Sequence, residues 1–286
     1  MGSDLGGLSR ADVDQILAKT AGTPYAHALL YGPYGTGKTM TALLSHKPDQ
    51  LSVPVTITES TTAAALVGHF LIRGGETVWH DNAPGLFAWE HGALLVINEV
   101  DKARGDVEDI LHVLLDDPAA ARLRLPSGRE VRPRDGFRCI ATMNGDLDDL
   151  PGALLDRFSI LLPVLRPSAH VVGTLPPDVA AAVDYIYSEA GKTDGGSPRY
   201  TFRQMRNFAE HRKRFPEKTA ALMVTGRADR ASALVELVSM LRLASSEQKL
   251  QGHPGMGTAP GSSPGASPQP EKGQAGGPRA SGHGLN

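Results

Sequence analysis

Short runs of apolar residues, each bounded by glycine, proline or polar residues, recur along the N-terminal part of the chain. Runs of this length that are rich in aliphatic residues are typical of buried strands, because a core helix needs a longer periodic segment. Five buried strands are therefore predicted, at residues 27–32, 53–58, 93–97, 137–142 and 159–164.

Segments with helical spacing of their apolar residues lie between these strands, and DVEDILHVLLDD (106–117) is a clear example. Strands that alternate with helices favour a mainly parallel sheet with helices on both faces. The pattern therefore predicts an α/β fold built on a parallel five-stranded sheet flanked by helices.

The pattern changes twice toward the C-terminus. Residues 175–245 contain helical patterns without strand patterns, which predicts a small all-α lid. Beyond them the chain is rich in Gly, Pro and Ser and has too few large apolar residues to offset the entropy lost on ordering. We therefore predict an α/β domain at 1–170, a helical lid domain at 171–245 and a disordered tail at 246–286.

Two segments have the pattern of β-hairpins. Alternating residues flank a Ser-Gly pair in RLRLPSGREVRP (122–133) and the pair Gly74-Gly75 in HFLIRGGETVWHD (69–81). Pairs of this kind supply the positive φ angles of tight hairpin turns, so both segments are expected to project as two-stranded ribbons.

A glycine-rich motif lies at the end of the first predicted strand. GPYGTGKT (32–39) matches G-x-x-x-x-G-K-[ST] in full, after a strand and before a helix, which is the context of a phosphate-binding loop. Its amide groups and the helix N-terminus attract phosphate, Lys38 is placed to contact the β- and γ-phosphates, and Thr39 supplies a hydroxyl to Mg²⁺. The residues expected to bind ATP are Gly32, Pro33, Tyr34, Gly35, Thr36, Gly37, Lys38, Thr39 and Met40.

The third predicted strand runs directly into Asn98 and Glu99. A carboxylate at this position of a P-loop protein can polarise the attacking water, and Glu99 is the candidate for that task. Asn98 stands where an aspartate near Mg²⁺ is usual, and its amide oxygen can accept a hydrogen bond from a metal-bound water but carries no charge. The sequence leaves two interpretations: a weaker metal site, or compensation by Asp101 through water.

Four segments together resemble AAA+ ATPases, and more narrowly their MoxR-like, dynein-related branch. They are GPYGTGKT, LLVINEVDKA, FRCIATMN and LPGALLDRF, in that order. The resemblance covers residues 8–165 well and residues 175–215 more loosely. It implies an ATPase that uses ATP and Mg²⁺ and that assembles into a ring, with six subunits as the first expectation.

The resemblance also implies roles for further residues. Asn144 corresponds to the sensor-1 residue that orients water, and Arg157 corresponds to the arginine finger that acts on ATP bound by a neighbouring subunit. The sensor-2 arginine corresponds to Arg203 or to Arg199, with Arg203 as the first choice. With Glu99, these are the candidate catalytic residues.

The resemblance places both predicted hairpins toward the ring pore or a partner. It implies a remodelling or assembly factor that acts on a protein client, with a von Willebrand A-domain protein as a candidate. Two other functions stay open: a nucleotide-dependent binding switch with weak hydrolysis, suggested by Asn98, and a nucleic-acid motor or loader.

The composition of the chain limits which of these classes of function are expected. The formal net charge of −2 does not indicate a nucleic-acid partner. Cys139 is the single cysteine, so an internal disulfide is impossible, as suits a reducing cytoplasm. No apolar run approaches the ~20 residues that span a bilayer, and the N-terminus lacks a secretory signal pattern, so a cytoplasmic protein without a membrane segment is expected. The histidines lack zinc-site spacing, and NEVDKA and TMNGD do not form a guanine-recognition motif.

Overall fold

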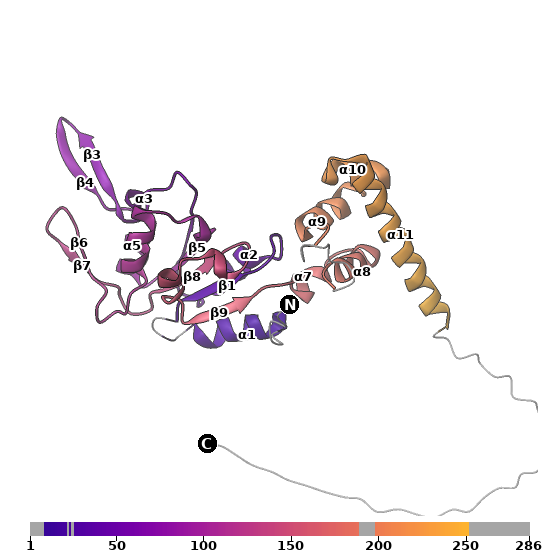
Figure 1. Ribbon diagram of the computed structural model, residues 1–286, viewed down its shortest axis with the longest axis horizontal. Coiled ribbons are helices and arrows are strands. Elements are labelled where there is room, and N and C mark those ends of the chain that lie inside the picture. The colour runs from indigo at the N-terminus through magenta and orange to yellow at the C-terminus, as the bar shows by residue number, and fades with distance from the viewer. Residues whose placement is uncertain (1–8, 22, 24–25, 189–197, 252–286) are drawn as a thin grey trace, which may run out of the picture. The chain divides into compact units, whose positions relative to one another are not determined.

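The computed structural model describes residues 9–21, 23, 26–188 and 198–251, and a parallel five-stranded sheet lies at the centre of its N-terminal part (Figure 1). The strand order is β2-β5-β8-β1-β9, and all pairs are parallel. This confirms the predicted α/β fold. The strands are β1 (Ala28–Tyr31), β2 (Ser52–Thr56), β5 (Leu94–Asn98), β8 (Arg138–Thr142) and β9 (Ile160–Pro163).

The sheet is buried on both faces because its central strands are almost entirely apolar. Leu29, Leu95 and Cys139 contribute to the core on one face, whereas Leu30 and Ile140 contribute to the core on the other. This alternation follows from the two-residue period of a strand, and it explains why the sequence shows continuous apolar runs rather than an alternating pattern.

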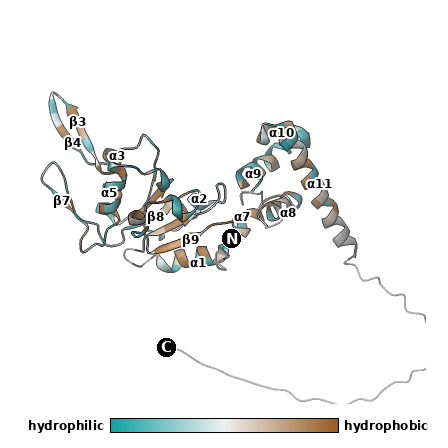
Figure 2. Ribbon diagram, viewed as in Figure 1, coloured by the Kyte–Doolittle hydropathy of each residue, from teal (hydrophilic) through white to brown (hydrophobic). Residues whose placement is uncertain are grey.

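Helices cover both faces of the sheet. Helices α1 (Arg10–Thr20) and α2 (Lys38–Leu44) contribute to one core, while α4 (Pro84–His91) and α5 (Asp106–Leu114) contribute to the other. Figure 2 shows hydrophobic and hydrophilic positions side by side on α1 and α5, as expected for helices with one buried face. The shorter elements are α3 (Ala63–Val67), α6 (Gly152–Leu155) and two 3-10 turns at Val100–Lys102 and Leu147–Asp149.

Both predicted hairpins are present. Strands β3 (His69–Arg73) and β4 (Glu76–His80) pair in antiparallel fashion around Gly74-Gly75, and this ribbon extends away from α3 in Figure 1. Strands β6 (Leu123–Arg124) and β7 (Glu130–Val131) form the shorter second hairpin. Every residue of β3 is exposed, so the apolar side chains of that strand are solvent-facing, whereas Trp79 of β4 packs against the core of the α/β part.

The C-terminal part of the described chain is helical. It consists of α7 (Ala169–Val172), α8 (Pro177–Ile186), α9 (Phe202–His211), α10 (Glu217–Thr225) and α11 (Ala228–Gln251). These helices share a hydrophobic core of their own, with Val183, Met205, Phe208 and Leu234 among its buried residues. Within the described residues, none of the helices is both long and apolar enough to cross a membrane.

Helix α11 corrects one predicted boundary. It continues to Gln251, past Ser246, where we expected a disordered tail to begin. The added residues include Glu, Gln, Lys and Leu, which favour helix, and Gly252 is the first residue that strongly opposes it. The rest of the predicted tail, residues 252–286, lies outside the described residues.

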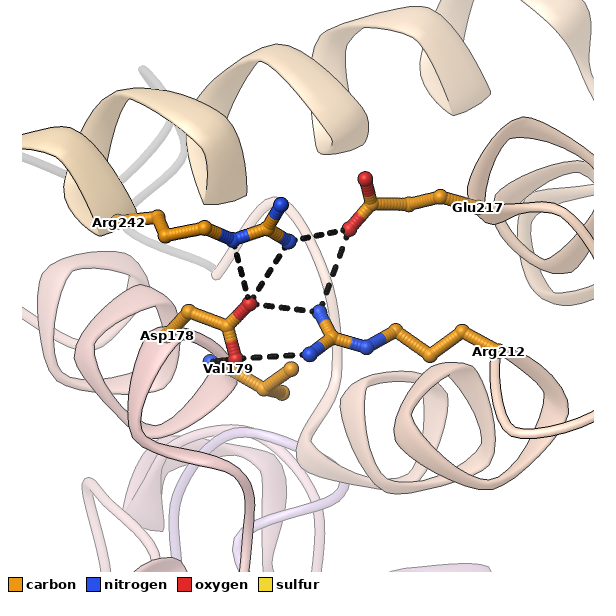
Figure 3. Close-up of polar contacts among 5 residues, drawn as sticks. All are labelled: Asp178, Val179, Arg212, Glu217 and Arg242. Carbon is orange, nitrogen blue, oxygen red and sulfur yellow. Dashed lines mark hydrogen bonds and ion pairs between the residues drawn. The ribbon is translucent and has the colours of Figure 1, made fainter.

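A cluster of charged residues joins four helical elements of this C-terminal part (Figure 3). Asp178 at the start of α8 accepts hydrogen bonds from Arg212 at the end of α9 (2.9 Å) and from Arg242 of α11 (2.8 Å). Glu217 of α10 accepts from both arginines, at 3.3 and 2.7 Å. Because the side chain of Asp178 is only 11% exposed, this cluster is screened less by solvent than an ordinary surface pair.

The carboxyl group of Asp178 has a lowered pKa. Burial alone would raise that pKa, but the hydrogen bonds from Arg212 and Arg242 and their positive charges outweigh it and hold the pKa below 3.8. The charged form of Asp178 therefore contributes stability at neutral pH, and this contribution is lost as the pH falls below 3.8 toward the pKa of the folded state.

We predict that Asp178→Asn lowers the free energy of unfolding by roughly 1–3 kcal/mol at neutral pH, because the half-buried guanidinium of Arg212 and the exposed guanidinium of Arg242 lose a shared, largely buried charged acceptor. Thermal unfolding of the full chain measures this effect. The control is Glu210→Gln, which removes the exposed pair with Lys213 and should change stability by less than about 0.5 kcal/mol. The difference between wild type and Asp178→Asn should also shrink in acid; equal stability of the two proteins at neutral pH would contradict the prediction.

Candidate functional site

Polar residues gather where three neighbouring strands end. Strand β8 lies between β5 and β1, and parallel strands bring their carboxyl ends to the same edge of the sheet. The glycine-rich loop follows β1, Asn98 ends β5, and Asn144 comes soon after β8. The order of the strands, which is not visible in the sequence, therefore places three of the predicted segments next to one another.

The glycine-rich loop adopts backbone conformations that favour glycine. Gly37 has a φ of 89° and occupies the N-cap of α2, so the loop enters the helix through a backbone geometry that favours glycine. Gly35 has a φ of 77°, and a Cβ atom there would lie 2.8 Å from the Cβ of Thr201. A side chain at Gly35 would therefore clash with the beginning of α9.

Lys38 is folded back onto the loop that contains it. Its ammonium group donates to the carbonyl oxygens of Gly32 (2.8 Å) and Pro33 (2.7 Å), and the residue is only 6% exposed. Burial lowers the pKa of Lys38 to about 8, although the negative charge of Asp101 acts in the opposite direction. Thr39 and Met40 are exposed at the start of the helix.

The end of β5 has an unusual backbone. Glu99 has a φ of 58°, and within the described residues it is the single non-glycine residue with a positive φ. Such a conformation is unfavourable for a residue with a Cβ atom and is often found at functional sites. The Glu99 carboxylate forms an ion pair with Lys102 one turn later.

Asn98 and Asp101 differ in their surroundings. The side-chain oxygen of Asn98 accepts a hydrogen bond from the Thr142 hydroxyl (3.3 Å), its neighbour in the register of β5 and β8. Asp101 instead has a buried carboxylate oxygen, Oδ1, that receives no hydrogen bond from the described part of the chain. A buried oxygen without a donor is a suitable ligand for a cation or for a cation-bound water.

Asn144 lies close to the loop. Gly145 forms an isolated antiparallel bridge with Gly32, and the Met143 amide donates to the Leu30 carbonyl (3.0 Å). The exposed Asn144 side chain is therefore attached to the backbone beside the beginning of the loop.

Arg157 and the two sensor-2 candidates are placed differently. The guanidinium of Arg157 donates to Asp116 (2.8 Å), so its partner in the described chain is not a group of the loop. The side chain of Arg199 lies over the ring of Tyr200, at 5.8 Å from its centroid. Arg203 is exposed in the first turn of α9 and makes no hydrogen bond or ion pair with the residues that the structure describes. The helix N-cap, Thr201, lies against Gly35, which brings this turn close to the loop.

Three residues that contact the predicted site were not identified from the sequence. Lys102 pairs with Glu99, Asp116 pairs with Arg157, and Arg10 of α1 donates to the carbonyl of Thr36 in the loop (3.2 Å). The pair of Lys102 and Glu99 could have been found, because opposite charges three residues apart are neighbours in a helical turn. The contacts of Asp116 with Arg157 and of Arg10 with Thr36 join segments far apart in sequence, so no local sequence pattern predicts them.

Comparisons with known proteins agree with this geometry. Residues 27–158 match the AAA domain (dynein-related subfamily). NorQ of Paracoccus denitrificans (strain Pd 1222) is 37% identical over 173 residues, which cover 57% of each protein. CbbQ of Hydrogenophilus thermoluteolus is 30% identical over 141 residues, 46% of this chain and 51% of CbbQ. The matched segments thus span only about half the length of these relatives.

A solved structure supports the fold alone. The structure of NtrX from Brucella abortus superposes with a TM-score of 0.50 at 22% identity and covers 72% of this chain and 50% of NtrX. The matched family segment contains the glycine-rich loop, the end of β5, Asn144 and Arg157. Residues 27–158 therefore match an AAA domain of the dynein-related subfamily and are similar to NorQ and CbbQ, as the motifs of this segment predict.

Proposed function

We propose that this chain binds ATP at the glycine-rich loop and hydrolyses it. The observation that carries the proposal is the convergence of Lys38, Glu99 and Asn144 at one edge of a parallel sheet. A cation, a carboxylate and an amide around a phosphate-binding loop are the groups that phosphoryl transfer to water requires. The match of residues 27–158 to an AAA domain supports the same function.

Lys38 is the group that changes partner when nucleotide binds. Its ammonium now contacts two neutral carbonyl oxygens, and a phosphate is a stronger acceptor because it carries charge. The lowered pKa of Lys38 shows that its buried charge lacks full compensation, so a bound polyphosphate would supply the missing negative charge.

The residues present fit a Mg²⁺ ion bound together with nucleotide. The exposed Thr39 hydroxyl, the orphaned oxygen of Asp101 and the amide oxygen of Asn98 are the groups that would hold the ion and its waters. When bound with nucleotide, Mg²⁺ neutralises phosphate charge. Asp101 is the charged member of this set. This supports the interpretation that Asp101 supplies the negative charge that Asn98 lacks.

Glu99 is proposed to polarise the attacking water. In the structure its carboxylate is paired with Lys102 rather than with a group of the glycine-rich loop. Hydrolysis therefore requires Glu99 to turn away from Lys102. The left-handed backbone conformation of Glu99 is unfavourable for a residue with a Cβ atom. A backbone change that turns the side chain away from Lys102 would therefore relieve this strain. Asn144 would help to orient the same water.

We further propose a ring, with six subunits as the first expectation, in which Arg157 completes the site of a neighbour. Arg157 is bonded to Asp116 rather than to its own loop, as a residue acting across an interface requires. The unit that acts would consist of an α/β domain at 1–170 and a lid at 171–245, with Arg203 as the sensor-2 residue.

The proposed cellular role is remodelling or assembly of a protein client in the cytoplasm. The exposed apolar side chains of β3 support a client-facing ribbon, with a von Willebrand A-domain protein as a candidate. A nucleotide-dependent switch with weak hydrolysis is the alternative function that one observation favours: Asn98 brings no negative charge to the metal side of the site. Turnover of ATP by the purified chain separates the two.

The pKa of Lys38 predicts how ATP affinity depends on pH. Bound phosphate favours the ammonium form, so affinity should be constant below pH 8 and fall by up to about tenfold per pH unit above it. Calorimetric titration between about pH 7 and about pH 9.5 measures this dependence. Lys38→Ala should bind ATP weakly at every pH, and Lys19→Ala, on an exposed part of α1, should behave like wild type. Equal affinity of Lys38→Ala and wild type would exclude this loop as the ATP site.

Glu99→Gln should separate binding from hydrolysis. The substitution keeps the shape of the side chain and removes its basicity, so turnover should fall by ~10²-fold or more while ATP affinity changes little. Phosphate release and calorimetry measure the two quantities. Glu210→Gln, an exposed site on α9, is the matched control and should retain full turnover. Unchanged turnover in Glu99→Gln would move the catalytic base to another residue, with Asp101 as the next candidate.

Mixing two inactive variants tests the shared site. Arg157→Ala and Lys38→Ala should each lose turnover, and their mixture should recover part of it where an intact Lys38 meets an intact Arg157 across an interface. Asp116→Asn is the control, because it breaks the ion pair with Arg157 but leaves the guanidinium available, so it should stay active. Absence of recovery despite demonstrated co-assembly would argue against a site shared between subunits.

A further inference from the structure

Helix α1 holds a guanidinium group against the phosphate-binding loop from outside the matched family segment. Val13 and Leu17 of α1 are fully buried in the same core as Ala42 of α2. A capping box formed by Ser9 and Asp12 fixes the beginning of α1. The first turn of α1, which contains Arg10, is therefore held in place relative to the helix that follows the loop.

Arg10 makes three contacts, and two of them lead to the loop. One guanidinium nitrogen donates to the carbonyl oxygen of Thr36 (3.2 Å), and the other donates to the hydroxyl of Thr41. The Nε–H donates to Asp14 (3.2 Å), which fixes the plane of the guanidinium. The side chain of Arg10 is only 12% exposed.

The contact with Thr41 is extended by one further hydrogen bond. The hydroxyl of Thr41 donates to the carbonyl oxygen of Gly37 (3.0 Å) while it accepts from Arg10. Arg10 thus holds the carbonyl of Thr36 directly. At Gly37 it acts on the carbonyl through the hydroxyl of Thr41, in addition to the helical hydrogen bond that the Thr41 amide donates to the same oxygen (2.9 Å).

Holding these carbonyl groups also fixes the amide groups of the loop. A peptide bond is planar and trans, so its C=O and N–H point in opposite directions. The carbonyl of Thr36 shares a plane with the N–H of Gly37, and the carbonyl of Gly37 shares a plane with the N–H of Lys38. Because both carbonyls are turned toward Arg10 and Thr41, the N–H groups of Gly37 and Lys38 are turned away from them, as donors to an anion in the loop must be.

The helix dipole does not favour an arginine at this position. Arg10 is the first residue of α1, and a positive charge there interacts unfavourably with the dipole, although its ion pair with Asp14 one turn later offsets part of that effect. The contacts with Thr36 and Thr41 are further interactions of this cation that lie outside its own helix.

We propose that Arg10 is a positioning residue for the phosphate site, which orients the amide groups of Gly37 and Lys38 toward the β-phosphate of a nucleoside di- or triphosphate. The proposal deepens the ATP-binding part of the proposed function and rests on it. It does not depend on hydrolysis, because the same amide groups would hold the β-phosphate of ADP.

Calorimetric titration of the full chain with ADP and with ATP tests the proposal. Arg10→Ala should weaken both affinities by about tenfold, the size of one lost charged hydrogen bond, and by a similar factor for the two nucleotides. Arg10→Lys should recover only part of the affinity, because an ammonium lacks the fork that reaches Thr36 and Thr41 together. Lys19→Ala removes an exposed basic residue of the same helix and should bind as wild type does.

A double-variant cycle separates positioning from a general loosening of α1. Thr41→Val removes the bridging hydroxyl and should weaken ADP binding in the wild type but much less in the Arg10→Ala background, because the two residues act on Gly37 in series. Thermal unfolding of Arg10→Ala, compared with that of Lys19→Ala, measures any loss of stability of α1 separately from the loss of affinity.

Unchanged affinity of Arg10→Ala for both nucleotides would overturn the proposal, as would additive effects of the two substitutions. If the wild type binds both nucleotides but does not hydrolyse ATP, the proposed ATPase activity fails and the role of Arg10 is still decided by the affinities. If the wild type binds neither nucleotide, both proposals fail.

Discussion

The parallel register of β5, β8 and β1 is the constraint on which the candidate site depends. These strands are buried on both faces, so their alignment is set by the packing of apolar residues such as Leu95, Cys139 and Leu29. Once they are aligned, their carboxyl ends must lie together. The glycine-rich loop, Glu99 and Asn144 then meet without any direct attraction between their side chains.

The charges at this edge are only partly compensated within the chain. Lys38 is buried against neutral carbonyls, and an oxygen of Asp101 has no donor among the described residues. Glu99, by contrast, is paired with Lys102 in a strained backbone conformation. A buried cation and a buried carboxylate without full partners are expected where an anion and a metal bind together, since the ligand supplies the missing charge.

The surrounding elements hold this arrangement from two directions. Helix α1 presents Arg10 to the carbonyl of Thr36, and the N-cap of α9 lies against Gly35. The helices from α7 onward have a separate core and the charged cluster around Asp178. The loop thus contacts α1 and the beginning of α9, which are stabilised by different cores. A change of conformation in either helix would alter the position of the loop at the candidate phosphate site.

The sequence by itself determined the strands, the hairpins and the chemistry of the loop, because those signals are local. Continuous apolar runs predict buried strands, and a turn pair such as Gly74-Gly75 needs no distant partner. The end of α11 was predicted less well: a composition rich in Gly, Pro and Ser marks where a helix cannot continue, but the helix-forming residues before Gly252 extend it further.

Only the tertiary structure decided which distant residues meet. Arg10 and Thr36, Asn98 and Thr142, and Arg157 and Asp116 are brought together by the order of strands and the packing of helices. The partner of each of these residues cannot be predicted from a single sequence, because the contact depends on how the whole core packs. The motif could therefore indicate where the candidate phosphate site lies, whereas the groups that contact its backbone became visible only in the folded chain.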